Sequence, residues 1–118
     1  MVYKYSAKSK AILSTVDTRL QKLFNEVIKY YDVSIIEGKR DIETQKRYLQ
    51  EGKSKTLKSK HLNGLAVDVG IYPLDFNNIN SFCELAGCVK TIAKQQGLKI
   101  VWGGDWKTFK DYVHFEIK

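Results

Sequence analysis

Four short apolar runs, each bounded by a residue that interrupts regular structure, most constrain the fold of this 118-residue chain. Their β-branched and aromatic content is typical of strands, and a nearby glycine, proline or aspartate limits the length of a run. The sequence therefore predicts strands at Val33–Glu37, Leu65–Ile71, Leu98–Trp102 and Val113–Ile117. Gly103-Gly104 predicts a turn between the last two.

Three segments with helical periodicity alternate with these strands. We expect helices over about Ser14–Tyr31, over Asp41–Glu51, and from Ser81 to the residue before Gly97. Asp41 is a plausible N-cap and Gly52 follows the same helix, while Ser81-Phe82-Cys83-Glu84 has the Ser-x-x-Glu form of a capping box. The order of elements predicts one α+β domain over residues 1–118.

Composition and charge exclude some classes of function but do not identify one. The chain is 43% hydrophobic, which is enough for a single core, and its 20 Lys+Arg against 13 Asp+Glu give a net charge of +7. Such a charge favours an anionic partner. The basic residues are scattered, however, and the sequence has no RNP-type aromatic pattern and no Cys/His finger spacing, so we expect no specific nucleic-acid binding.

The cysteines and the apolar segments predict a protein without disulfides or membrane spans. Cys83 and Cys88 lie five apart in a predicted helix, and we expect buried free thiols. No segment approaches the roughly 18 apolar residues of a membrane helix, and the first residues contain no apolar signal-peptide region. We therefore expect synthesis in the cytosol and no insertion into a membrane.

Both histidines of the chain lie in short motifs of the kind that hold a metal ion. The motifs are Ser59–Asp68 (SKHLNGLAVD) and Asp111–Glu116 (DYVHFE). Neutral imidazole and carboxylate are ligands that Zn²⁺ accepts, and a catalytic zinc site uses three protein ligands so that water can take the fourth position. His61, Asp68 and His114 would supply those three, which makes a zinc hydrolase our leading hypothesis.

The predicted strand that contains Asp68 suits a metal ligand. Strand alternation places Ala66 and Asp68 on one face and the adjacent valines on the other, so a small residue lies beside the ligand while the valines pack into the core. Gly64 permits a tight turn between His61 and this strand. For each residue taken singly a structural role is the alternative, because an isolated histidine is usually a surface or hydrogen-bonded residue.

The two motifs resemble the Ser-x-His-x-x-Gly-x-Ala-x-Asp and Asp-x-x-His-x-Glu signatures of the VanY-like D-Ala-D-Ala carboxypeptidases and the LAS group of zinc peptidases. Within this group the chain resembles the small L-alanyl-D-glutamate peptidases that phages use as endolysins. The similarity runs from about Ile35 to Glu116 and includes Gly38-Lys39-Arg40 and Trp102-Gly103-Gly104-Asp105-Trp106. It implies a Hedgehog/DD-peptidase-like fold with a small antiparallel sheet and about three helices.

The resemblance implies that His61, Asp68 and His114 bind zinc and that Asp111 is the catalytic acid/base. Zinc lowers the pKa of bound water toward about 7, and a nearby carboxylate can take the proton and pass it to the leaving amine. Asp111 precedes His114 by three residues, so it must lie on the turn that enters the last strand. Glu116 shares the face of His114 and could be the base instead; we favour Asp111, with Glu116 orienting a ligand.

Further residues are candidates for contacts with a substrate. Arg40 resembles the family's substrate-binding arginine, which would hold a carboxylate or stabilise the oxyanion at the scissile carbonyl; the alternative is a surface arginine beside a helix. Ser59 is a candidate for a hydrogen bond to the substrate or a ligand. Gln45 is another, although it could simply face solvent. Trp106 and Trp102 could line the cleft, and core packing explains Trp102 equally well.

The expected function is a zinc-dependent peptidase that hydrolyses the L-Ala-D-Glu bond in the stem peptide of bacterial peptidoglycan. Two alternatives stay open: a D,D-carboxypeptidase or dipeptidase that acts on D-Ala-D-Ala, and a non-catalytic zinc-containing module that binds the wall. As a monomeric phage endolysin, the protein would be made in the host cytoplasm. It would need a separate holin-like protein that permeabilises the membrane to reach the cell wall.

Overall fold

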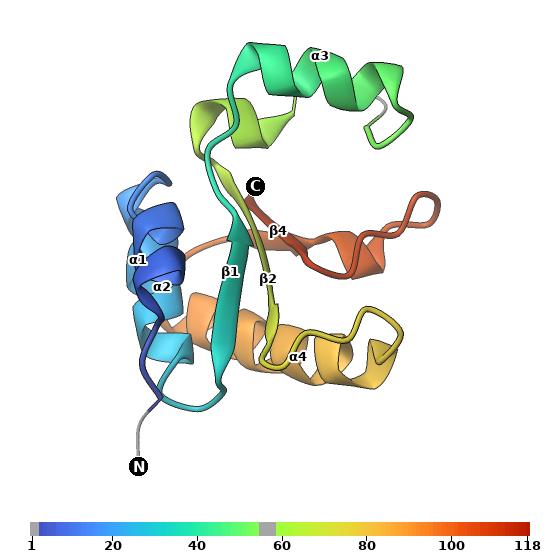
Figure 1. Cartoon of the computed structure of the whole chain (residues 1–118). Helices are drawn as coiled ribbons and strands as arrows, with labels where there is room; N and C mark the ends of the chain where they lie inside the picture. The colour runs from blue at the N-terminus through green and yellow to red at the C-terminus, as the bar shows by residue number, and fades with distance from the viewer. Residues whose placement is uncertain (1–2, 55–58) are drawn as a thin grey trace.

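A computed structural model describes residues 3–54 and 59–118 and places four strands in one antiparallel sheet (Figure 1). The strands are β1 (Val33–Glu37), β2 (Ala66–Ile71), β3 (Ile100–Trp102) and β4 (His114–Ile117). Their order across the sheet is β1-β2-β4-β3, so β2 and β4 are central. Each strand lies within its predicted range, and the predicted antiparallel sheet is confirmed.

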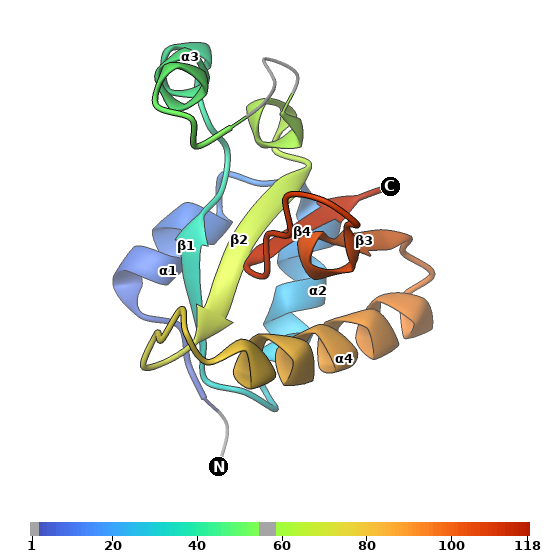
Figure 2. The same ribbon diagram turned by 90° about the vertical axis from the view of Figure 1, so that its right-hand side faces the viewer.

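In the described part of the chain, some helices pack against this sheet and others lie beyond one end of its strands (Figure 2). They are α1 (Ala7–Leu13), α2 (Thr18–Val27), α3 (Ile42–Gln50), α4 (Ile79–Gln95) and the short 3-10 helices η1 (Lys60–Asn63) and η2 (Gly103–Asp105). The prediction of about three helices missed α1. No described helix has both the length and the apolar character needed to cross a membrane.

Capping side chains explain where the helices depart from their predicted bounds. The helix expected from about Ser14 begins only at Thr18, because the carboxylate of Asp17 accepts a hydrogen bond from Arg19 N at 2.9 Å. The prediction that Ser81 caps the third helix was wrong. Asn78 is the cap, and its side chain accepts a hydrogen bond from Ser81 N at 3.3 Å. The predicted cap Asp41 accepts a hydrogen bond from Thr44 N at 2.7 Å.

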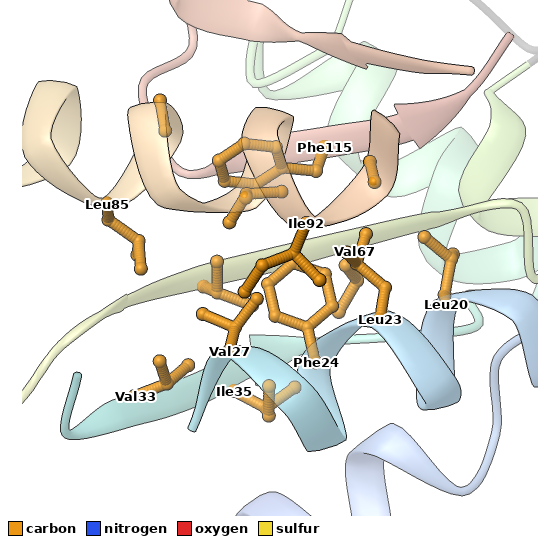
Figure 3. Packing of buried hydrophobic residues seen from close by; sticks show 14 of the residues in the cluster. Leu20, Leu23, Phe24, Val27, Val33, Ile35, Val67, Leu85, Ile92 and Phe115 are labelled. Carbon is orange, nitrogen blue, oxygen red and sulfur yellow. The ribbon is translucent and has the colours of Figure 1, made fainter. Parts of the chain in front are cut away.

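The core lies between one face of the sheet and helices α2 and α4 (Figure 3). Phe24 of α2 and Phe115 of β4 are fully buried there, with ring centroids 5.9 Å apart in an edge-to-face arrangement. Burial of a side chain of this size contributes about 1.5–3 kcal/mol. Since successive strand residues point to opposite faces, burial of Val67 and Phe115 turns Asp68 and His114 to the other face.

Helix α1 protects the outer edge of the sheet. Ser9 is buried, and its Oγ accepts a hydrogen bond from the backbone N–H of Ile35 at 3.0 Å. A strand at the edge of a sheet otherwise leaves such donors unpaired. Both cysteines are free, but Cys83 is exposed and Cys88 is only partly buried. The prediction of two buried thiols was wrong for Cys83.

Candidate metal centre

Three elements bring the predicted ligands together. His61 lies on η1, which Ser59 caps by accepting a hydrogen bond from His61 N at 3.2 Å. Gly64 ends η1 with a φ of 70°, a conformation that glycine adopts without strain, and the chain turns there into β2. Asp68 of β2 lies directly opposite His114 of β4 in the antiparallel register. The sheet therefore fixes two ligands and the turn supplies the third.

The three ligand atoms form a nearly equilateral triangle. His61 Nε2, Asp68 Oδ1 and His114 Nδ1 are each 3.2 Å from the other two. Tetrahedral zinc with bonds of about 2.0–2.1 Å requires ligand atoms about 3.3 Å apart, so the spacing fits this metal. Among residues 3–54 and 59–118 this is the one group of His, Cys, Asp and Glu side chains with metal-ligand spacing, and it includes neither cysteine.

Hydrogen bonds orient both imidazole rings. His61 Nδ1 lies 2.8 Å from the carbonyl oxygen of Gly38, and because a carbonyl only accepts, we assign the proton to Nδ1 and leave the Nε2 lone pair to the centre. His114 Nε2 lies 2.8 Å from Oε1 of Glu116, which assigns the lone pair of Nδ1 to the centre in the same way. Lys60 Nζ lies 3.3 Å from the second oxygen of Glu116.

The electrostatics of the triad favour a cation. Burial on its own raises the pKa of Asp68, but hydrogen bonds with the rings of His114 and His61 outweigh it and hold the pKa well below its ordinary value. Burial lowers the pKa of His114, yet Asp68 and Glu116 raise it overall. An ionised carboxylate thus lies between two imidazole rings, and this is a charge arrangement that a divalent cation satisfies.

Asp111 lies beside this triad on the turn that precedes β4. It lines a cavity of about 650 Å³ together with His61 and His114. Burial raises the pKa of the Asp111 carboxyl, and the negative charge of Asp68 raises it further. A carboxyl group with a raised pKa beside such a triad is a candidate for proton transfer.

Arg40 occupies the same cavity and is held from several sides. Its Nε donates to Glu37, its Nη1 donates to Gln45 Oε1 at 2.6 Å, and its guanidinium lies 4.7 Å from the centroid of the Tyr48 ring. With a side chain only 9% exposed, Arg40 is not the surface arginine of the alternative reading. The fixed fork is suited to bind an anion or a developing oxyanion.

Gln45 and Trp102 are buried, whereas Trp106 lines the cavity. Gln45 is 0% exposed, so it does not face solvent, and its side chain supports Arg40 from inside the protein. Trp106 and Ser59 line the cavity, and the Trp106 ring lies 5.1 Å from that of His114. Trp102 is 7% exposed and donates from Nε1 to Tyr112 O at 2.8 Å, so it belongs to the core.

Sequence reasoning missed Glu37 and Tyr48. Glu37 ends β1 opposite Asp68, at a register shift after Ile35, and this irregularity aims its carboxylate at Arg40. The bulge has no sequence signature that would have revealed it. Tyr48 lies eight residues after Arg40 on a predicted helix, and that spacing alone does not show a contact.

Comparisons with known proteins identify the family of the chain. The sequence profile of the family "Phage L-alanyl-D-glutamate peptidase" matches residues 1–118. The chain is 31% identical to the L-alanyl-D-glutamate peptidase of Escherichia phage T5, over the whole chain and 91% of that protein. It is 34% identical to the peptidoglycan L-alanyl-D-glutamate endopeptidase CwlK of Bacillus subtilis (strain 168), over 75% of the chain and 62% of that protein.

A solved structure supports the same relationship. The crystal structure of the Serratia marcescens L-Ala D-Glu endopeptidase ChiX matches with a TM-score of 0.89 at 31% identity. The match covers 98% of the chain and 90% of ChiX, so the fold is shared throughout. The chain therefore belongs to the phage L-alanyl-D-glutamate peptidase family.

Proposed function

We propose that this protein is a zinc peptidase that hydrolyses the L-Ala-D-Glu bond in the stem peptide of peptidoglycan. The observation that carries the proposal is the triangle of His61, Asp68 and His114 ligand atoms at 3.2 Å spacing, beside a cavity lined by the half-buried carboxyl group of Asp111. The bond is chosen because the family profile and the relatives are named for L-alanyl-D-glutamate cleavage.

Zinc is the proposed metal because two imidazoles and one carboxylate form a three-ligand set with the spacing of a tetrahedral site. When bound, Zn²⁺ supplies a Lewis acid that polarises a carbonyl and lowers the pKa of water toward about 7. A structural zinc site is usually closed by four protein ligands, and a catalytic one keeps a position open. The three-ligand group of the described residues supports the catalytic type.

The side chains of the cavity take complementary roles. Asp111 accepts the proton of the attacking water and gives it to the leaving amine, a transfer favoured by the raised pKa of its carboxyl. Arg40, fixed by Glu37, stabilises negative charge on the scissile carbonyl oxygen, which contributes several kcal/mol where donors are preorganised. Glu116 holds the His114 ring in its binding orientation. Trp106 forms an apolar wall.

The test is mass spectrometry of purified peptidoglycan after digestion with zinc-loaded protein and with a chelator-treated control. Release of peptides that begin at D-Glu, only in the zinc-loaded sample, supports the proposal. Loss of a terminal D-Ala alone would indicate a D,D-carboxypeptidase. Stable wall binding without cleavage of several wall types would indicate a binding module.

We further propose a monomeric endolysin that is made in the host cytoplasm and acts on the wall after a holin-like protein has permeabilised the membrane. The net charge of +7 supports attraction to the anionic envelope. Expression in a bacterial host with and without a separate permeabilising protein tests this route. Lysis that depends on the second protein is the expected result, and a single monomer mass in light scattering is expected for the isolated chain.

A further inference from the structure

Four basic side chains among the described residues line the cavity beside the candidate metal centre, and three of them pair with a carboxylate. The cavity is lined by Arg40, Lys53, Lys60 and Lys110. The ion pairs are those of Arg40 with Glu37, of Lys53 with Glu51 at 3.1 Å, and of Lys60 with Glu116 at 3.3 Å. These three cations therefore have their charge balanced within the protein.

Lys110 differs from the other three. Its Nζ donates to the carbonyl oxygen of Gly104 at 3.1 Å, and no carboxylate in the described part of the chain forms an ion pair with it. A carbonyl group carries a dipole but no net charge. Lys110 therefore presents an uncompensated positive charge at the wall of the cavity, where a bound anion is the natural partner.

The loop that carries Lys110 is held at both ends. The carbonyl oxygen of Gly103 accepts hydrogen bonds from Trp106 N at 3.3 Å and from Asp111 N at 3.1 Å. The hydrogen bond from Lys110 Nζ to the carbonyl oxygen of Gly104 ties the lysine side chain to the residue that follows Gly103. An ammonium group in a loop closed in this way loses less conformational freedom when it binds a ligand than one on a free loop.

Substrate chemistry supplies an anion close to the scissile bond. A D-Glu residue carries two carboxyl groups, and only one of them can take part in the main chain. We infer that Lys110, one residue before Asp111, recognises the second D-Glu carboxylate and makes the enzyme select free acids over amidated stem peptides. This inference rests on the proposed function and specifies its substrate class.

The test compares two peptides that contain L-Ala-D-Glu and differ only at the second D-Glu carboxyl group, which is free in one and amidated in the other. Charge-assisted hydrogen bonds are strong, so the wild type should show a kcat/KM for the acid about tenfold or more above that for the amide. Lys110→Gln should bring this ratio close to one, Lys110→Glu should reverse it, and Lys110→Arg should keep it.

Lys107→Gln is the matched control, because Lys107 is an exposed lysine of the same loop that does not line the cavity. Its acid-to-amide ratio should equal that of the wild type. If Lys110 only ties the loop to Gly104, Lys110→Gln will lower both rates equally and leave the ratio unchanged. That result would overturn the inference while the peptidase activity stands.

Binding of the same two peptides, measured by calorimetry, separates this inference from the proposed function. If the wild type cleaves neither peptide, the proposed bond specificity fails. Recognition of the free carboxylate by Lys110 is then still supported if the wild type binds the acid about tenfold more tightly and Lys110→Gln removes the difference. Equal affinity of the wild type for both peptides would overturn it.

Discussion

His114 and Glu116 lie two residues apart on β4, and their side chains meet on the same face of the sheet with His114 Nε2 2.8 Å from Glu116 Oε1. The contact uses the ring nitrogen that points away from the triad, so the opposite nitrogen faces Asp68 and His61. A carboxylate in this position fixes the ring and increases its basicity. The pair explains how one short strand can provide both a ligand and its support.

Glu116→Gln should weaken zinc binding by about 10–100-fold without unfolding the protein, because the ring loses its charged partner while every ligand remains. Zinc affinity is measured by competition with a chelating dye. Glu43→Gln is the control, since Glu43 is 82% exposed on α3 and its neutralisation should leave the affinity unchanged. Equal affinity in the two variants would show that Glu116 does not support the ligand.

Asp111→Asn should retain stoichiometric zinc and lose turnover by about 10²–10⁴-fold, because the amide keeps the shape of the side chain but transfers no proton. Metal analysis and the rate of peptide hydrolysis together check this result. Asp105→Asn, which alters an exposed carboxylate paired with Lys90 at 2.6 Å, should keep both zinc and turnover. Loss of zinc from the Asp111 variant would mean that Asp111 is a ligand.

His114→Ala should remove the stabilisation that zinc confers. Metal that binds only the folded state contributes about 2.7 kcal/mol at a free concentration 100 times its Kd, so zinc should raise the Tm of the wild type but not of the variant. Thermal unfolding is measured with zinc and with chelator. Trp106→Phe, which changes a ring 5.1 Å from His114 but no ligand, should keep the zinc-dependent shift. A full shift in His114→Ala would remove this residue from the proposed triad.

The sequence predicted an element well where its bounds depend on residues that are close to it in the chain. The strand Val33–Glu37 was predicted with its observed bounds, because β-branched residues are enclosed by Asp32 and Gly38. Helix α1 was missed because a seven-residue helix contains too few turns to display a clear apolar period. At the start of α4, Asn78 and Ser81 are both good caps, and the sequence does not indicate which one the chain uses.

The candidate site also has a part that the sequence predicted and a part that it did not. The predicted ligands meet in one triangle, because a chain with two histidines offers few other sets and strand alternation turns Asp68 to the face opposite the core. The support of Arg40 was not predicted. It depends on the register shift before Glu37 and on Gln45 being fully buried, and both follow from how β1 and α3 pack against their neighbours.

Gly103 makes the position of Asp111 sensitive to a single methyl group. A Cβ at Gly103 would lie 2.3 Å from the backbone oxygen of Asp111 and 3.0 Å from its Cβ, so the two segments cannot keep their spacing. Gly103→Ala should displace Asp111, destabilise the protein by about 1–3 kcal/mol and lower turnover by about 10²-fold. Denaturant unfolding and the rate of peptide hydrolysis measure these effects.

Gly87→Ala is the matched control for this substitution. Gly87 is an exposed residue within α4, and a Cβ there meets no atom within 4 Å. Alanine has the higher helix propensity, so this variant should gain about 0.5–1 kcal/mol and keep its turnover. Unchanged turnover in Gly103→Ala would show that the contact between Gly103 and Asp111 does not position the carboxyl group for proton transfer, since crowding at that contact must move one of the two segments.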